Sequence, residues 1–231
     1  PIRRREPAPF ADDTAALAIV VKVSPSMMTE DVQPARLTRT IQKIHDLLEK
    51  RKGAKTALIA YAGTAHLVMP ATTDEGIIDS FAAALDPRIM PEDGDAAADA
   101  LRLADKALTD AGNGSILWIT DGVATEQAAA LAAWRKQSST DVRLLPALLP
   151  GDELKSLQQT TKPVDATLVQ LAADDSDVSA LARAEKFATA SAAGASDHWQ
   201  ESGYWLTPLA ALLMLPFFRR GWMVRTANHG T

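Results

Sequence analysis

The sequence contains no cysteine among its 231 residues. This absence excludes a disulfide framework, a thiolate nucleophile and a zinc-thiolate site, while it leaves the redox compartment open. The four histidines lack the spacing of a metal-binding pair, so nothing supports a histidine-based metal site. The net charge of -5 and the scattered basic residues give no electrostatic attraction toward nucleic acid, and we do not expect nucleic acid as a partner.

The sequence also lacks the motifs of two common enzyme classes. It has neither the G-x-x-x-x-G-K-[ST] loop of nucleotide hydrolases nor the G-x-S-x-G turn of serine hydrolases. A Ser-Lys pair made of Lys22 with Ser24 or Ser26 remains a hydrolase hypothesis, because a desolvated lysine can act as a base. No oxyanion hole is evident for such a pair, so we expect a protein that is not an enzyme.

The order of apolar and amphipathic segments predicts an α/β fold. Short apolar runs alternate with segments of helical periodicity from residue 15 to 149, which indicates βα units around a mostly parallel sheet. The runs 57–61 and 65–69 are separated by Ala-Gly-Thr and predict a hairpin, with one antiparallel strand at the sheet edge. We expect one domain over 15–195, with helices on both faces of the sheet.

The element boundaries follow from apolar periodicity and turn residues. Besides the hairpin, we expect strands over 17–23, 115–120, 142–148 and 166–171, and helices over 34–52, 72–85, 95–109, 126–137, 151–161 and 177–190. Thr72 and Glu75 have the spacing of a capping box and predict the start of the second of these helices.

The segment 203–220 has a different character. It covers most of the charge-free stretch between Glu201 and Arg219 and ends on Arg219 and Arg220, with aromatic residues near both ends. This combination predicts a transmembrane helix, with a buried core helix and a peripheral amphipathic helix as the alternatives. The arginines that follow predict a cytoplasmic tail over 221–231 and a domain on the far side of the bilayer. Residues 1–14 are expected to be a juxtamembrane linker, in a chain that begins as a fragment or a processed form.

Polar residues follow several of the predicted strands and are expected to meet at one edge of the sheet, because ligand sites in α/β sheets form at the carboxyl ends of the strands. These candidate binding residues are Lys22, Ser24, Ser26, Asp95, Thr120 and Asp121.

The stretch 23–37 resembles the start of a von Willebrand factor type A domain of the bacterial Bat-type, membrane-anchored group, which is BatB-like and associated with aerotolerance. The stretches 60–65, 70–74, 85–91, 119–122, 174–178 and 203–222 are also similar to that group. The resemblance implies a Rossmann-like domain that binds proteins in a bacterial inner membrane, with the domain in the periplasm. The partners it implies are other Bat-type von Willebrand A proteins and a MoxR-type AAA+ ATPase.

The resemblance also implies a metal-ion-dependent adhesion site, which this sequence only partly reproduces. The family pattern is Asp-x-Ser-x-Ser, a threonine after the second helix and an aspartate before glycine. Ser24, Ser26 and Asp121 match it, but Lys22 replaces the first aspartate and Asp95 replaces the threonine. An ammonium has no lone pair and repels a dication, so Lys22 opposes metal binding.

Our hypothesis is that the lysine nitrogen takes the space of the metal, so that no cofactor is needed. Asp121 and Asp95 would pair with the ammonium, and the hydroxyls of Ser24 and Ser26 would accept its protons. Two alternatives remain open. Lys22 can point into solvent beside a loop that has lost its role, or Mg²⁺ can be retained through Ser24, Ser26, Asp95 and Asp121.

Overall fold

The central strand of the protein is β1 (Ala16–Lys22), and all seven of its residues are buried. In the computed structural model, which describes residues 15–112 and 114–169, β1 lies between β2 (Thr56–Tyr61) and β4 (Gly114–Thr120) and runs parallel to both. Alternate side chains of β1 face opposite sides of the sheet, and both sides are apolar. A strand covered on both faces explains the unbroken apolar run in the sequence.

The sheet has six strands in the order β3-β2-β1-β4-β5-β6. β5 (Asp141–Pro146) and β6 (Thr167–Leu168) continue the parallel part, whereas β3 (Ala65–Thr72) pairs antiparallel with β2 and forms the edge. The predicted hairpin, the mostly parallel sheet and the antiparallel edge strand are therefore confirmed.

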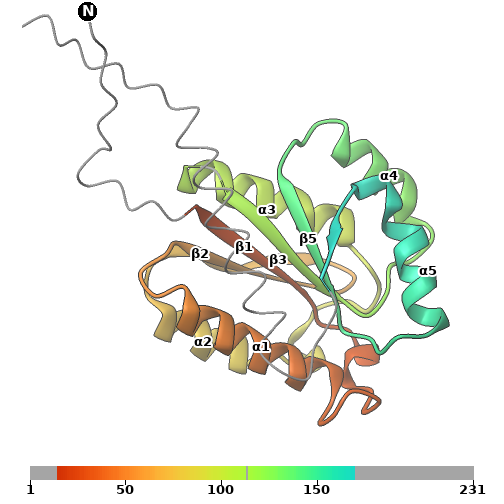
Figure 1. The fold of residues 1–231 in the computed structure, drawn as a ribbon, viewed down its shortest axis with the longest axis horizontal. Helices are drawn as coiled ribbons and strands as arrows, with labels where there is room; N and C mark the ends of the chain where they lie inside the picture. Colours follow the sequence, from red (N-terminus) through yellow and green to blue (C-terminus); the bar gives the residue numbers. More distant parts are fainter. Residues whose placement is uncertain (1–14, 113, 170–231) are drawn as a thin grey trace, which may run out of the picture. The chain divides into compact units, whose positions relative to one another are not determined.

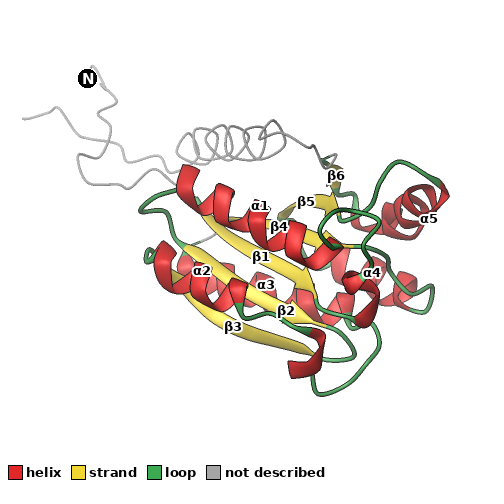
Figure 2. Cartoon of the chain, turned by 90° about the horizontal axis from the view of Figure 1, so that it is seen from below, coloured by secondary structure: helices red, strands yellow, loops and turns green. Residues whose placement is uncertain are grey.

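Helices cover both faces of the sheet, as predicted (Figures 1 and 2). α1 (Arg36–Lys50) and α2 (Glu75–Ala83) pack on one face through residues such as Leu37, Leu47 and Ile78. The other face is covered by α3 (Ala97–Ala111), α4 (Gln127–Arg135) and α5 (Asp152–Thr161). Three short 3-10 segments complete the described chain: η1 (Pro25–Met28), η2 (Pro87–Ile89) and η3 (Lys162–Val164).

The predicted capping box at Thr72 is wrong. Thr72 is the last residue of β3 and pairs with Thr56, so its backbone belongs to the sheet. Asp74 caps α2 instead, because its side chain accepts a 3.1 Å hydrogen bond from the backbone N–H of Ile77. The local pattern contained two candidate caps, and strand pairing decided between them.

Other boundaries differ from the predictions by a few residues. α3 begins at Ala97 rather than at residue 95 and extends to Ala111, where Gly112 ends it in the left-handed region with φ of 99°. Glycine takes this conformation without steric cost. α1 begins at Arg36, after an extended Ala35, rather than at residue 34.

Several predictions lie outside the described residues: the linker 1–14, the helix 177–190, the transmembrane helix 203–220 and the tail 221–231. Within 15–112 and 114–169, none of the helices has both the length and the apolar character that crossing a bilayer requires.

Candidate functional site

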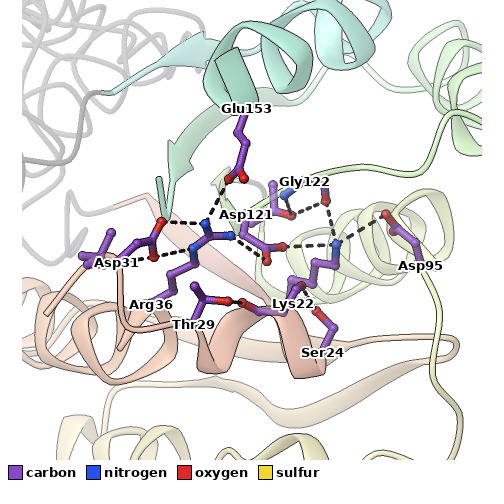
Figure 3. A network of polar contacts seen from close by, with 12 residues as sticks. Lys22, Ser24, Thr29, Asp31, Arg36, Asp95, Asp121, Gly122 and Glu153 are labelled. Carbon is purple, nitrogen blue, oxygen red and sulfur yellow. Dashed lines mark hydrogen bonds and ion pairs between the residues drawn. The ribbon is translucent and has the colours of Figure 1, made fainter. Parts of the chain in front are cut away.

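Lys22 ends β1 and turns its side chain into the protein, where only 11% of it is exposed. Its ammonium donates a 2.9 Å hydrogen bond to the carbonyl oxygen of Gly122 and lies 3.2 Å from Oδ1 of Asp121 and 3.8 Å from Oδ2 of Asp95 (Figure 3). The alternative in which Lys22 extends into solvent is therefore wrong. Parallel strands bring this cation and these carboxylates together, since β1 and β4 end at the same edge of the sheet.

Asp121 directly follows β4, and its side chain is 3% exposed. Its Oδ1 accepts no hydrogen bond from the described residues, although it lies 3.2 Å from the ammonium of Lys22. The two observations agree if the N–H groups of Lys22 point elsewhere, chiefly to Gly122, while the opposite charges still attract each other at this distance. Asp121 is thus paired by charge rather than by an aligned hydrogen bond to Lys22.

A second buried cation, Arg36, contacts the other oxygen of Asp121 at 3.4 Å. Arg36 is the first residue of α1, and its guanidinium also donates two hydrogen bonds to Asp31, at 2.7 and 2.6 Å, and one to Glu153 at 2.9 Å (Figure 3). The sequence reasoning missed this residue. A signal was available, because Arg36 precedes Thr40, Lys43 and Leu47 at helical spacing, and all four lie on the buried side of α1.

Two carboxyl groups of the site have pKa values that are shifted in opposite directions: that of Asp31 is lowered and that of Asp95 is raised. The hydrogen bonds that Arg36 donates to Asp31 hold the pKa of Asp31 below its ordinary value of 3.8, and the same bonds raise the pKa of Arg36. Burial raises the pKa of Asp95 above 3.8, even though the N–H of Ala124 and the charge of Lys22 act in the opposite direction.

Asp95 is held mainly by the backbone. Its two oxygens accept the N–H of Ala97 at 3.0 Å and the N–H of Ala124 at 2.8 Å, so it ties the first residue of α3 to the loop after β4. These bonds are shorter than its 3.8 Å contact with Lys22. The carboxylate therefore serves the backbone of two loops as well as the charge of the lysine.

The loop that carries Asp95 is packed against the turn between β2 and β3. Gly63 donates a 2.9 Å hydrogen bond to the carbonyl oxygen of Glu92, and Ala96 donates one of 2.6 Å to that of Ala62. A Cβ atom on Gly63 would lie 2.5 Å from the carbonyl oxygen of Asp93, so only glycine fits here without a shift of the backbone. The turn thereby positions Asp95.

Contrary to the prediction, the hydroxyls of Ser24 and Ser26 do not contact the ammonium of Lys22. The hydroxyls of Ser24 and Ser26 lie 2.9 Å from each other, and among the described residues the polar partners of the ammonium of Lys22 are Gly122, Asp121 and Asp95. This geometry gives no support to a Ser-Lys hydrolase, which needs the lysine within hydrogen-bond reach of the serine.

Thr120 shapes the turn that receives the lysine. Its hydroxyl donates a 2.7 Å hydrogen bond to the carbonyl oxygen of Gly122 and accepts one of 3.2 Å from the N–H of the same residue. This side chain is fully buried at the end of β4. Its position explains how the carbonyl oxygen of Gly122 is directed toward Lys22.

The arrangement does not fit a magnesium ion. Magnesium requires oxygen lone pairs directed at one point, at about 2.1 Å. Here both oxygens of Asp95 accept backbone N–H groups, and the oxygens of Asp121 face two cations. In the part of the chain that the structure describes, no group of three or more His, Asp or Glu side chains is arranged to hold a metal.

Comparison with known proteins agrees with this architecture. Residues 17–123 match the von Willebrand factor type A domain. Together with the sheet topology, this match, which covers a little under half of the chain, shows the von Willebrand A fold. The predicted fold class is confirmed to that extent, and no curated protein matches the sequence.

Solved structures with the same fold include two from Bacteroides. The conserved hypothetical protein BatB of Bacteroides thetaiotaomicron is 23% identical, with a TM-score of 0.64 over 77% of this chain and 99% of its own. An aerotolerance-related membrane protein of Bacteroides fragilis is also 23% identical, with a TM-score of 0.63 over 75% and 99%. A mutant of the PilB minor pilin of Streptococcus sanguinis is 13% identical, with a TM-score of 0.61 over 82% and 65%. At these identities the similarity shows the von Willebrand A fold.

Proposed function

We propose that this von Willebrand A domain is a non-catalytic protein-protein interaction module in which Lys22 replaces the metal of the adhesion site. The observation that carries the proposal is the position of the ammonium of Lys22, 3.2 Å from Asp121 and 3.8 Å from Asp95. A positive charge that is covalently attached neutralises these carboxylates at any metal concentration. Binding through this domain is therefore expected to survive chelation.

The contacts of the ammonium support a structural role for the lysine. Its neighbours Gly122, Asp121 and Asp95 all belong to this chain, and they surround a side chain that is almost completely buried. A metal ion in an adhesion site accepts a ligand from the partner, whereas a buried ammonium has no vacant orbital to accept one. Partner contacts would then come from the loops that surround Lys22.

The membrane setting is the second part of the proposal. We place the domain in the periplasm of a bacterium, anchored in the inner membrane through 203–220, because this segment carries no charge before Arg219 and has aromatic residues near its ends. The partners would be other Bat-type von Willebrand A membrane proteins. A cytoplasmic MoxR-type AAA+ ATPase would be reached through membrane segments or another subunit.

Thermal unfolding in the presence of metal tests the replacement of the metal. The melting temperature of the wild type should be the same with magnesium, with manganese and with a chelator. The variant Lys22→Asp with Asp95→Thr rebuilds the family pattern around Ser24, Ser26 and Asp121, and magnesium should raise its melting temperature by several degrees at saturation. The control variant, Lys52→Asp with Asp110→Thr, makes the same charge changes at exposed positions and should not respond to metal. A rise with magnesium in the wild type would contradict the proposal.

Affinity capture from solubilised membranes tests the interaction function. The wild-type domain should retain the same partner with and without chelator, and the purified partner should then bind the purified domain. Lys22→Met should weaken this binding, while Lys52→Met, at an exposed position, should not. Circular dichroism would confirm that both variants are folded. Binding that disappears with chelator would favour metal-dependent adhesion instead.

A further inference from the structure

The loops at the carboxyl edge of the sheet carry many exposed carboxylates. We call this surface the site edge and define it by the loops 23–35, 84–96, 121–126 and 147–153. Its exposed acidic residues are Glu30, Asp31, Glu92, Asp93, Glu126, Asp152 and Glu153. Within these loops the one basic residue is Arg88, and it is already paired with Asp86 at 2.7 Å. The exposed part of the site edge is therefore strongly acidic.

Four of these carboxylates, Glu30, Glu92, Asp93 and Glu126, form no ion pair with the residues that the structure describes. Arg36 binds Asp31 and Glu153, and Lys155 binds Asp152 at 2.8 Å. Of the two buried cations of the site, Lys22 is directed inward at Asp121 and Asp95, and Arg36 joins Asp121 to Asp31 and Glu153. Neither cation pairs with Glu30, Glu92, Asp93 or Glu126 in the described part of the chain.

Large apolar side chains are exposed on three of the same loops. Met28 is 49% exposed, Ile89 is 60% exposed and Leu149 is 53% exposed. They follow β1, lead toward Asp95 and follow β5, respectively. Exposed apolar side chains beside charged ones are typical of a protein-binding surface, in which apolar contacts are surrounded by a polar rim.

One turn at the opposite edge of the sheet is basic. The turn from α1 to β2 exposes Lys50, Lys52 and Lys55, and its acidic neighbour Glu49 is paired with Lys52 at 3.1 Å. The sign of the exposed charge thus differs from loop to loop, and the loops of the site edge carry carboxylates with Arg88 as their one basic residue. Local charge of one sign selects partners of the other sign.

We propose that the site edge binds a protein surface on which lysine or arginine side chains lie beside an apolar side chain. This inference rests on the proposed interaction function and specifies the chemistry of the partner. In a metal-dependent adhesion site the partner supplies a carboxylate, but here a carboxylate would meet Glu92, Asp93 and Glu126 with no metal to attract it. Like charges held within about 8 Å repel each other at physiological ionic strength, and amines in the same place are attracted.

Three matched synthetic peptides test the charge preference. In each peptide leucine alternates with one polar residue, which is lysine, glutamine or glutamate, and binding is measured by fluorescence anisotropy at low and high salt. The lysine peptide should bind the wild type most tightly, and salt should weaken its binding. Glu92→Gln with Asp93→Asn and Glu126→Gln should weaken that binding about tenfold.

The control variant is Glu49→Gln with Asp110→Asn and Asp165→Asn, which removes the same number of exposed charges away from the site edge. It should bind the lysine peptide as the wild type does. Equal weakening in both variants, tighter binding of the glutamate peptide, or no binding of the lysine peptide would each overturn the charge preference.

The same variants separate this inference from the proposed function. If the captured partner binds the wild type and the site-edge variant equally in chelator, the interaction function stands and the charge preference fails. If the lysine peptide shows the expected pattern but the wild type retains no partner, the charge preference stands and the proposed function fails.

Discussion

The ammonium of Lys22 lies 3.2 Å from Oδ1 of Asp121, and the two side chains are 11% and 3% exposed. Such a buried ion pair adds little net stability when it is compared with two apolar residues, but removal of one partner leaves the other charge buried and uncompensated. The pair therefore makes the folded state depend on Lys22. Arg36 reduces this dependence, because it contacts the second oxygen of Asp121 at 3.4 Å.

Replacement of Lys22 by methionine should lower the free energy of unfolding by about 3 kcal/mol, the lower end for a broken buried pair, since Arg36 still contacts Asp121. Urea unfolding measures this loss. The double variant Lys22→Met with Asp121→Asn should recover part of it, because the buried charge of Asp121 is then removed together with its cation. A single variant as stable as the wild type would mean that Lys22 is not the counterion of Asp121.

Replacement of Gly63 by alanine should move the loop that carries Asp95. The new Cβ would lie 2.5 Å from the carbonyl oxygen of Asp93, and overpacking of this kind costs about 1–3 kcal/mol. Hydrogen exchange should become faster at the amides of Ala97 and Ala124, which donate hydrogen bonds to the carboxylate of Asp95. Gly122→Ala is the control, because a Cβ there would have no atom within 4 Å. Unchanged exchange in Gly63→Ala would show that the turn does not hold this loop.

Asp105 holds α3, α4 and the start of β5 together. Its oxygens accept hydrogen bonds from Trp134 at 2.7 Å, from Ser138 at 3.0 Å and from Thr140 at 2.7 Å. Asp105→Ala should cost about 2–3 kcal/mol in chemical unfolding, because the three donors lose their acceptor. The fluorescence of the folded state should change, since the indole N–H of Trp134 loses its partner. Asp110→Ala, in an exposed position of the same helix, should be close to neutral and serves as the control.

Asp95 should give stability an unusual dependence on pH. Burial raises its pKa in the folded protein above the ordinary value of 3.8. Between 3.8 and this raised pKa, the folded state holds a proton that the unfolded state has released, so the contribution of Asp95 to stability falls as the pH rises through this window. The free energy of unfolding of the wild type minus that of Asp95→Asn should therefore decrease from acidic pH toward neutrality.

Asp31 provides the comparison of opposite sign. Hydrogen bonds from Arg36 lower its pKa, so its contribution is present above 3.8 and is lost as the pH falls below that value. Urea unfolding of Asp95→Asn and Asp31→Asn across the acidic range would check both signs, and carboxyl NMR titration would give the two pKa values directly. If the stability difference between wild type and variant changed with pH in the same direction for Asp95→Asn and Asp31→Asn, the assigned pKa shifts would be contradicted.

The sequence predicted the layers of the fold well, because each prediction depended on local periodicity. The apolar run of β1, the hairpin of β2 and β3 and the amphipathic face of α1 can each be recognised from residues that lie only a few positions apart in the sequence. The cap of α2 was predicted wrongly, since Thr72 and Asp74 are both good caps and only the pairing of Thr72 with Thr56 excludes the first.

By itself, the sequence determined that Lys22, Asp95 and Asp121 end or follow elements that converge at one edge of an α/β sheet. Only the tertiary structure decided which polar atoms meet there. Arg36 contacts Asp121 from 85 positions away and Glu153 from 117 positions away, and the hydroxyls of Ser24 and Ser26 pair with each other rather than with the lysine. The physical reason is that periodicity fixes which face of an element is buried, whereas the partners of a buried charge depend on how distant elements pack around it.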